Sequence, residues 1–354
     1  MSSLDKSGSK SFLSVQTIVL AQVAWAVLAL LFFLLFSVTP KGQEPPTWYS
    51  LGTSIFEATA YLVAFLLCFR NWRSPQIVSG RNVWLCIGLG MLFYFLGNLL
   101  FTYWELGLGL EAAVSPGDFF FILTYIFLVL GLWQAVSSRR LNLEIWQKGV
   151  VVGIGAIGIA LAIWLGSSAP QEPDKTAFFL ESPVYAQAAP ATKPSVKSAP
   201  AAKPAASAQP ASTTPATSPI VASPNSAKAD ATEGKSNSPQ WAIDLENALK
   251  PFKDPVNLFY QVCDVILLVL ATALLLAFWG GRFSQSWRMI AFAAFCLYVA
   301  DIWFKYANDH IPEYKSGSLP EVGWVFCGVL FGIGAALEYD LSSRSRRGSS
   351  RRRA

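Results

Sequence analysis

The feature that most constrains this chain is a series of eight apolar runs. A helix needs about 20 residues to cross the roughly 30 Å hydrocarbon core of a bilayer, and each run approaches that length. The runs lie at approximately 14–37, 52–69, 84–104, 117–137, 149–166, 257–279, 288–306 and 321–338. Only 14% of the 354 residues are charged, against about 25% in soluble domains. The sequence therefore predicts an all-α integral membrane protein with eight transmembrane helices.

The distribution of arginine predicts the orientation. If the N-terminus lies inside, all thirteen arginines fall in inside segments, whereas the outside segments carry only lysine. Because basic residues accumulate in cytoplasmic segments, we expect both termini in the cytoplasm. The first run is long enough to act as a signal anchor, and no cleavable signal peptide is evident. The expected location is the plasma membrane of a bacterium, with another internal membrane as the alternative.

Residues 167–256 have a different composition, dominated by Ala, Pro, Ser, Thr and Lys. Such a segment cannot bury enough apolar surface to offset its chain entropy, so it predicts a disordered extracytoplasmic loop. The loop is either a tether or a segment that reaches a cell-wall or periplasmic partner. The chain then divides into a cytoplasmic N-terminus (1–13), a first membrane half (14–166), this loop, a second half (257–340) and an Arg-rich tail (341–354).

A short helix is predicted near the end of this loop. Ser238 can cap its N-terminus with Pro239 as the first helical residue, and Pro251 limits its end. Its apolar residues would lie on the membrane surface. They are Trp241, Ile243, Leu245 and Leu249.

The two membrane halves are related by a shift of 203 residues. Both copies begin on the same side, so the predicted arrangement is a parallel repeat of four plus four helices, with the helix at 149–166 assigned to the second copy. Trp84 and Trp287 are equivalent and are predicted to anchor the inner interface. Further pairs are Gly97 and Ala300, Phe101 and Phe304, Ser115 and Ser318, and Gly131 and Gly334.

Six polar residues lie in or beside the apolar runs, within about two turns of the outer ends. An ionised side chain is costly in hydrocarbon, so we expect these residues to face the bundle interior or a water-filled cavity. In equivalent pairs they are Glu57 and Asp264, Asn98 and Asp301, and Asp118 and Glu321. We predict an outward-facing polar pocket in each half, or one pocket shared by both.

Structural roles are the alternatives. Asp118 and Glu321 fall in a first helical turn, where a carboxylate stabilises the free amides. Asp301 precedes Lys305 by one turn, a favourable order for an ion pair. Glu57 and Asp264 have no basic residue within one turn. They are the best binding candidates, unless each bonds to the backbone of a neighbouring helix.

One pattern spans the third and fourth runs: Trp84…Gly97-Asn98…Tyr103…Ser115-Pro116-Gly117-Asp118-Phe119…Tyr125…Gly131. It resembles the multi-helix membrane modules that precede bacterial diguanylate cyclase and other signalling output domains. The resemblance covers about residues 50–140 and, more weakly, 255–340. Asn98 replaces the acid usual in those modules, and the tail after the second membrane half is only about fourteen residues long (341–354). The resemblance implies a sensory or ligand-binding membrane module.

Enzymatic signatures are not evident. An intramembrane aspartyl protease would need Gly-x-Gly-Asp, and the sequence before Asp118 lacks the first glycine. The chain has one histidine, His310, and five cysteines without metal-ligand spacing. No phosphate loop or dinucleotide fingerprint occurs. We therefore expect a non-enzymatic protein without a cofactor or metal.

Three function classes remain. The first is a receptor-like or accessory module that acts through a partner protein. The second is a small transporter, which a parallel repeat with membrane carboxylates permits, although midplane Gly/Pro interruptions are not evident. The third is a structural or assembly factor of a membrane complex.

The C-terminal segment carries six arginines: Arg344, Arg346, Arg347, Arg351, Arg352 and Arg353. Anionic lipids attract such segments by about 1 kcal/mol per basic residue. The alternative is that these arginines serve only to keep the C-terminus on the cytoplasmic side. Nucleic-acid binding is not expected, because the segment has no aromatic residues for stacking.

Proteolysis of intact cells or spheroplasts tests the topology. A protease added outside should cut only between about residues 167 and 256, because all arginine-containing segments lie on the other side. The two fragments should remain associated through their packed helices. Cleavage in the arginine tail from outside would contradict the topology.

Overall fold

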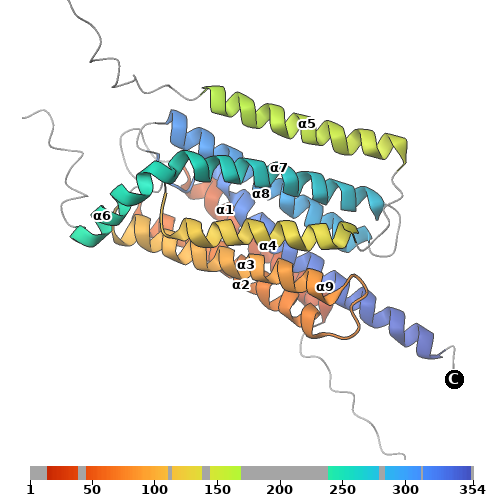
Figure 1. Cartoon of the computed structure of the whole chain (residues 1–354). Coiled ribbons are helices and arrows are strands. Elements are labelled where there is room, and N and C mark those ends of the chain that lie inside the picture. The colour runs from red at the N-terminus through yellow and green to blue at the C-terminus, as the bar shows by residue number, and fades with distance from the viewer. Residues whose placement is uncertain are drawn as a thin grey trace, which may run out of the picture. The chain divides into compact units, whose positions relative to one another are not determined.

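The computed structural model describes residues 14–38, 45–110, 114–137, 144–168, 238–278, 284–311 and 314–351. These residues form α-helices joined by short π and 3-10 turns (Figure 1). The α-helices are α1 (Val15–Phe36), α2 (Thr47–Arg73), α3 (Arg81–Thr102), α4 (Gly117–Ser137), α5 (Ile145–Ser168), α6 (Gln240–Leu249), α7 (Lys253–Ala277), α8 (Ser284–His310) and α9 (Val322–Arg351). The π turn η1 (Tyr103–Gly107) continues α3, and the 3-10 turns η4 (Lys250–Phe252) and η5 (Leu319–Glu321) precede α7 and α9.

Eight of the helical segments are long and apolar enough to cross a membrane, which confirms the all-α class and the eight predicted spans. The protein is therefore an integral multi-pass membrane protein. Most of the segment predicted to be a disordered loop lies outside the described residues.

Several helices extend beyond their apolar runs. α2 begins at Thr47 rather than 52, and α7 at Lys253 rather than 257, because polar residues occupy their first turns. Glu57 is thus ten residues from the start of α2, and Asp264 eleven from the start of α7. At 1.5 Å per residue both lie about 15 Å from those ends, deeper than the predicted two turns.

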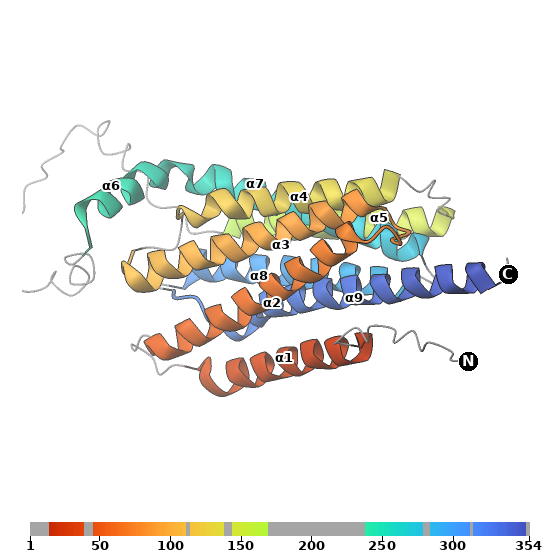
Figure 2. The same ribbon diagram turned by 90° about the horizontal axis from the view of Figure 1, so that it is seen from below.

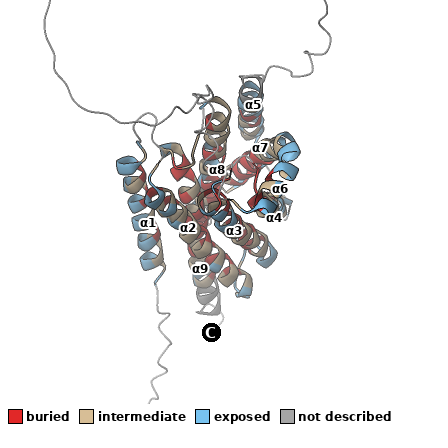
Figure 3. Cartoon of the chain, turned by 90° about the vertical axis from the view of Figure 1, so that its left-hand side faces the viewer, coloured by how far each residue is buried: buried red, intermediate tan, exposed pale blue. Residues whose placement is uncertain are grey.

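Two groups of three helices make the centre of the bundle. α2 packs on α3 and α3 on α4, while α7 packs on α8 and α8 on α9. The groups meet where α2 contacts α9 and where α4 contacts α7. α1 lies against α9 and α2, and α5 against α7 and α8 (Figure 2). Buried residues gather between the central helices, whereas α1 and α5 expose most of their surface (Figure 3).

Trp84 and Trp287 lie in the core, so their prediction as interface anchors is wrong. Both rings are buried, with centroids 6.4 Å apart. The Trp84 indole donates a hydrogen bond to Ser79 Oγ at 2.7 Å. The sequence shows only that each tryptophan lies near the end of an apolar helix. It does not show whether the ring faces lipid or packs against a second helix. Phe101 and Phe304, which the predicted repeat pairs with each other, also meet, with centroids 6.5 Å apart.

The short helix predicted after Pro239 is confirmed as α6. Its capping is different, because the Ser238 hydroxyl donates to the Leu108 carbonyl at 2.5 Å instead of accepting from α6 amides. Ala242 is buried against Trp104 and other residues that end the third span. α6 is therefore attached to the bundle through its apolar face.

The last helix continues into the arginine-rich segment. α9 is helical through Arg351, and Arg344 forms a 2.8 Å ion pair with Asp340. The backbone at Arg346 and Arg347 is also helical, whereas Arg352 and Arg353 lie outside the described residues.

A glycine contact between α8 and α9 provides a test of this packing. A Cβ added at Gly323 would lie 2.8 Å from the Cys296 carbonyl oxygen and 3.1 Å from Ala300 Cβ. We expect Gly323→Ala to lower the free energy of unfolding by about 1–3 kcal/mol, measured by thermal unfolding in detergent. Gly153→Ala is the matched control, because nothing lies within 4 Å of its Cβ position. Equal midpoints for the two variants would contradict the packing.

Candidate functional site

The central helices enclose a cavity of ≈ 140 Å³. It is bordered by residues of α2, α3, η1, α4, α7, α8, η5 and α9, by Ser316 before η5, and by one residue each of α1 and α5. The structure places all six polar residues chosen from the sequence around this single space: Glu57, Asn98, Asp118, Asp264, Asp301 and Glu321. Glu105 and Asp309 also border it. We call this space the acidic cavity.

Glu57 is held by a tyrosine from the next helix. The Tyr94 hydroxyl on α3 donates to Glu57 Oε1 at 2.7 Å. Its partner is thus a side chain and not a helix backbone, the alternative considered above. One turn after Tyr94, Asn98 is 4% exposed, and its Oδ1 atom accepts no hydrogen bond from the described residues. A buried amide oxygen without a donor is costly, so Asn98 offers a vacant acceptor at the cavity wall.

Asp264 and Asp301 share one tyrosine. The Tyr125 hydroxyl on α4 contacts Asp264 Oδ1 at 2.7 Å and also contacts Asp301 Oδ2. The indole N–H of Trp324 donates to Asp301 Oδ1 at 2.7 Å. A hydroxyl has one proton, and it can donate to only one of the two carboxyl groups. Tyr125 therefore links the two aspartates, with its proton donated to one carboxyl group and its oxygen close to the other.

Asp118 bridges its own loop and a second helix. Its Oδ2 accepts from the Ser115 amide at 2.7 Å, and its Oδ1 accepts from the Tyr260 hydroxyl of α7 at 2.6 Å. The first bond is the carboxylate half of a capping box. The capping alternative is thus observed, and the same side chain also borders the acidic cavity.

Glu321 organises the loop before α9. Its Oε2 accepts from the Gly317 amide at 2.6 Å and from the Ser316 hydroxyl at 2.8 Å. Gly317 has φ +122°, a backbone conformation that favours glycine. Tyr314 also donates to Glu321. Burial and the nearby Glu321 carboxylate raise the pKa of Tyr314 above its usual value, so this hydroxyl keeps its proton.

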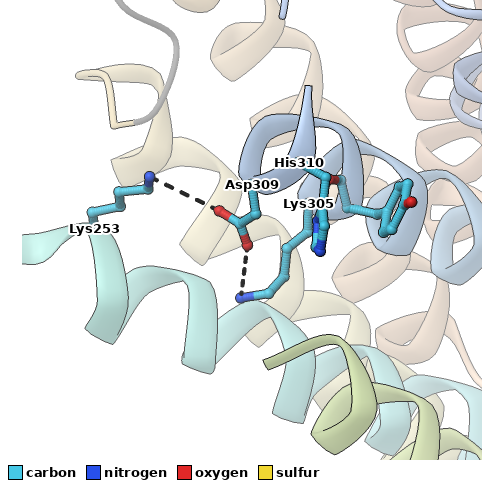
Figure 4. Close-up of polar contacts among 5 residues, drawn as sticks. Lys253, Lys305, Asp309 and His310 are labelled. Atoms are coloured by element: carbon cyan, nitrogen blue, oxygen red, sulfur yellow. Dashed lines mark hydrogen bonds and ion pairs between the residues drawn. The ribbon is translucent and has the colours of Figure 1, made fainter. Parts of the chain in front are cut away.

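Charged residues at the cavity mouth pair with one another. The Nζ atoms of Lys253 and Lys305 lie 4.0 and 3.9 Å from the carboxylate oxygens of Asp309 (Figure 4). The expected Lys305–Asp301 pair is therefore wrong. Both positions are one turn from Lys305, but Asp301 is already bound by Tyr125 and Trp324, whereas Asp309 is reached by two lysines. Next to this group, His310 stacks on the Tyr306 ring with centroids 4.3 Å apart.

The hydrogen-bond donors of the site were not predicted. Tyr94, Tyr125, Tyr260 and Trp324 are aromatic residues in apolar surroundings, where the sequence does not distinguish them from core or lipid-facing rings. Glu105 was missed because it follows the apolar run, although η1 carries it onto the cavity wall. Short π turns occur often at functional sites, but the residue types of Tyr103–Gly107 do not distinguish a π turn from an α-helical one.

The cysteines and histidine do not form a metal-ligand group. Among the described residues, no set of three or more His, Cys, Asp or Glu side chains is placed to hold a metal ion. Comparison with known proteins found no matching protein family, no similar curated protein and no similar solved structure.

Removal of the Tyr125 hydroxyl tests its role between two helices. Tyr125→Phe leaves Asp264 without its donor and Asp301 with one donor fewer, so we expect the free energy of unfolding to fall by about 1–3 kcal/mol. The measurement is thermal unfolding of the purified protein. Tyr103→Phe is the matched control, because the Tyr103 ring is 56% exposed. A loss no larger than that of the control would show that the hydroxyl is not a stabilising link.

Proposed function

We propose that this protein is a receptor-like membrane module, not an enzyme, which binds a small polar molecule in the acidic cavity and acts through partner proteins. The observation that carries the proposal is that polar side chains from separate helices converge on one cavity. Six polar side chains from six helical elements (α2, α3, α4, α7, α8 and η5) border one space. Polar groups inside a membrane bundle are costly, and their collection around a single cavity is typical of a ligand or ion site.

The proposal includes an internal duplication in which α2–α4 and α7–α9 are equivalent. Trp84 touches its equivalent Trp287, and Phe101 touches its equivalent Phe304. A residue meets its own equivalent where a twofold axis passes between the two. The α2–α9 and α4–α7 contacts exchange under the same operation. These contacts support a twofold relation between the halves, with the acidic cavity near its axis.

Equivalent glycine contacts support the same relation. A Cβ at Gly131 would lie 3.1 Å from Ile87 Cγ1, and one at Gly334 would lie 3.2 Å from Ile290 Cγ1. Ile87 and Ile290 are separated by the same 203 residues as the two glycines. The small residues thus bring together corresponding faces of α3 and α4 and of α8 and α9.

In this proposal the acidic cavity faces the extracytoplasmic side of the membrane. Arg70 and Arg73 end α2, and Arg81 begins α3, at the end of the bundle opposite Glu57 and Asn98. Because arginine favours the cytoplasmic side, both termini would lie inside a bacterial plasma membrane. Contact of the α9 arginines with anionic lipids is part of the same proposal.

A receptor-like role is favoured by the resemblance of residues 50–140 to the membrane modules of bacterial signalling proteins. A small transporter would use the same duplication and the same carboxyl groups. An assembly factor would need no ligand. Ligand-induced stabilisation, combined with an uptake assay, separates these three functions.

A screen of the full-length protein against fractions of a cellular small-molecule extract tests the proposal. At least one fraction should raise the midpoint of thermal unfolding of the wild type by about 3 °C or more. The shift should be lost in Asp264→Asn, which keeps a polar side chain beside Tyr125 but removes the carboxyl group. Asp244→Asn, on the exposed side of α6, is the control and should keep the full shift.

Two outcomes would contradict the proposal, and each would favour one of the other two functions. The absence of any fraction that separates wild type from Asp264→Asn would reject a ligand-binding role and favour an assembly factor. Accumulation of the active compound inside proteoliposomes that contain the protein would identify a transporter.

A further inference from the structure

We propose that the ligand of the acidic cavity is a small organic cation that carries an ammonium group. This inference rests on the proposed function, because it specifies the chemical class of the molecule that the cavity binds. Three properties of the cavity carry it: its unbalanced charge, its vacant hydrogen-bond acceptors and its aromatic wall.

The charge of the cavity wall is the first property. Seven carboxyl groups and two lysines border the cavity. The carboxyl groups are Glu57, Glu105, Asp118, Asp264, Asp301, Asp309 and Glu321. Both lysines, Lys253 and Lys305, are paired with Asp309 at the mouth. Within the described part of the chain, no ion pair reaches Glu57, Asp118, Asp264, Asp301 or Glu321.

These five carboxyl groups thus have no basic partner among the described side chains. Carboxylates gathered around one cavity repel one another and are stabilised by a cation. A positively charged ligand is therefore the species that this wall complements best.

The hydrogen-bonding capacity of the wall is the second property. The donors Tyr94, Tyr125, Tyr260 and Trp324 are already directed at carboxyl oxygens. Asn98 Oδ1 is an acceptor without a donor on a side chain that is only 4% exposed. Each carboxyl group has further lone pairs. The spare capacity is thus mainly acceptor capacity, which suits the N–H groups of an ammonium ion.

One donor is also available. Gln261 Nε2 borders the cavity and has no hydrogen-bond partner among the described residues. It can donate to a hydroxyl or carbonyl oxygen at the other end of the same ligand. This favours a molecule with one ammonium group and one acceptor.

The aromatic wall is the third property. Phe101, Phe121, Phe304 and Trp324 line the cavity together with the tyrosines. The faces of aromatic rings attract ammonium groups and also contact alkyl carbons. A cavity needs about 10–15 Å³ to hold one water, so ≈ 140 Å³ has room for a molecule considerably larger than water. The wall therefore fits an organic cation with a short carbon chain.

Matched pairs of small molecules test the class of ligand on the full-length protein. Ethanolamine, 3-amino-1-propanol and putrescine are the cationic probes, and ethylene glycol, 1,3-propanediol and 1,4-butanediol are their neutral counterparts. At least one cation should raise the midpoint of thermal unfolding by about 3 °C or more, and its neutral counterpart should not.

Two variants locate the effect. Asp264→Asn should weaken binding of the active cation by about tenfold or more, because it removes a carboxyl group and keeps a hydrogen-bonding side chain. Asp244→Asn makes the same chemical change on the exposed side of α6 and should leave the affinity unchanged. Each affinity is obtained by titration of the unfolding midpoint with the probe. If Asp264→Asn does not fold, Glu57→Gln takes its place in the comparison.

Several outcomes would overturn the inference. Stabilisation by neutral counterparts to the same extent, by carboxylate anions, or by Mg²⁺ or Ca²⁺ in place of ammonium compounds would assign the cavity to another class. A shift by none of the three cations would also reject it. An extract fraction whose active compound is neutral or anionic would reject this inference while leaving the proposed function intact.

Discussion

Carboxyl groups placed among membrane-spanning helices need donors, and in this protein the donors come from other helices. Tyr94 reaches from α3 to Glu57 on α2, and Tyr260 reaches from α7 to Asp118 on α4. Asp264, Tyr125, Asp301 and Trp324 connect α7, α4, α8 and α9. Apolar packing between helices gains little over packing against lipid. These polar bonds therefore define which helices are neighbours and how they are rotated about their axes.

The number and type of helices could be predicted from the sequence. Mean hydropathy adds the small preference of each residue for lipid over about twenty residues, so the total is clear even where single residues are ambiguous. The sequence was insufficient for the ends of the helices. Lys253 begins α7 although the apolar run starts later, since a helix can carry polar residues in its first turns. The π turn Tyr103–Gly107 continues the third span past the end of its run. Both errors placed the polar residues too close to the helix ends.

The acidic members of the site could be recognised individually, because a carboxyl group in an apolar run is unusual wherever it occurs. Their partners could not. Tyr94 and Tyr125 resemble core aromatic residues until the fold directs their hydroxyl groups at carboxyl oxygens. Lys305 has an acid one turn away on either side, and tertiary contacts decided that it pairs with Asp309. Where a residue has two possible partners at the same spacing along a helix, only the three-dimensional arrangement shows which one it contacts.

The depth of Asp264 has a consequence for the electrical behaviour of the protein. This residue lies seven residues, about 10 Å, inside the apolar run that begins at 257, and a bilayer core is about 30 Å thick. A charge that crosses the whole membrane changes in energy by about 2.3 kcal/mol for each 100 mV. An ion bound beside Asp264 from the nearer side would cross roughly a third of that field, which corresponds to about 0.8 kcal/mol per 100 mV. Occupancy of the cavity by a charged molecule would then depend on the membrane voltage as well as on concentration.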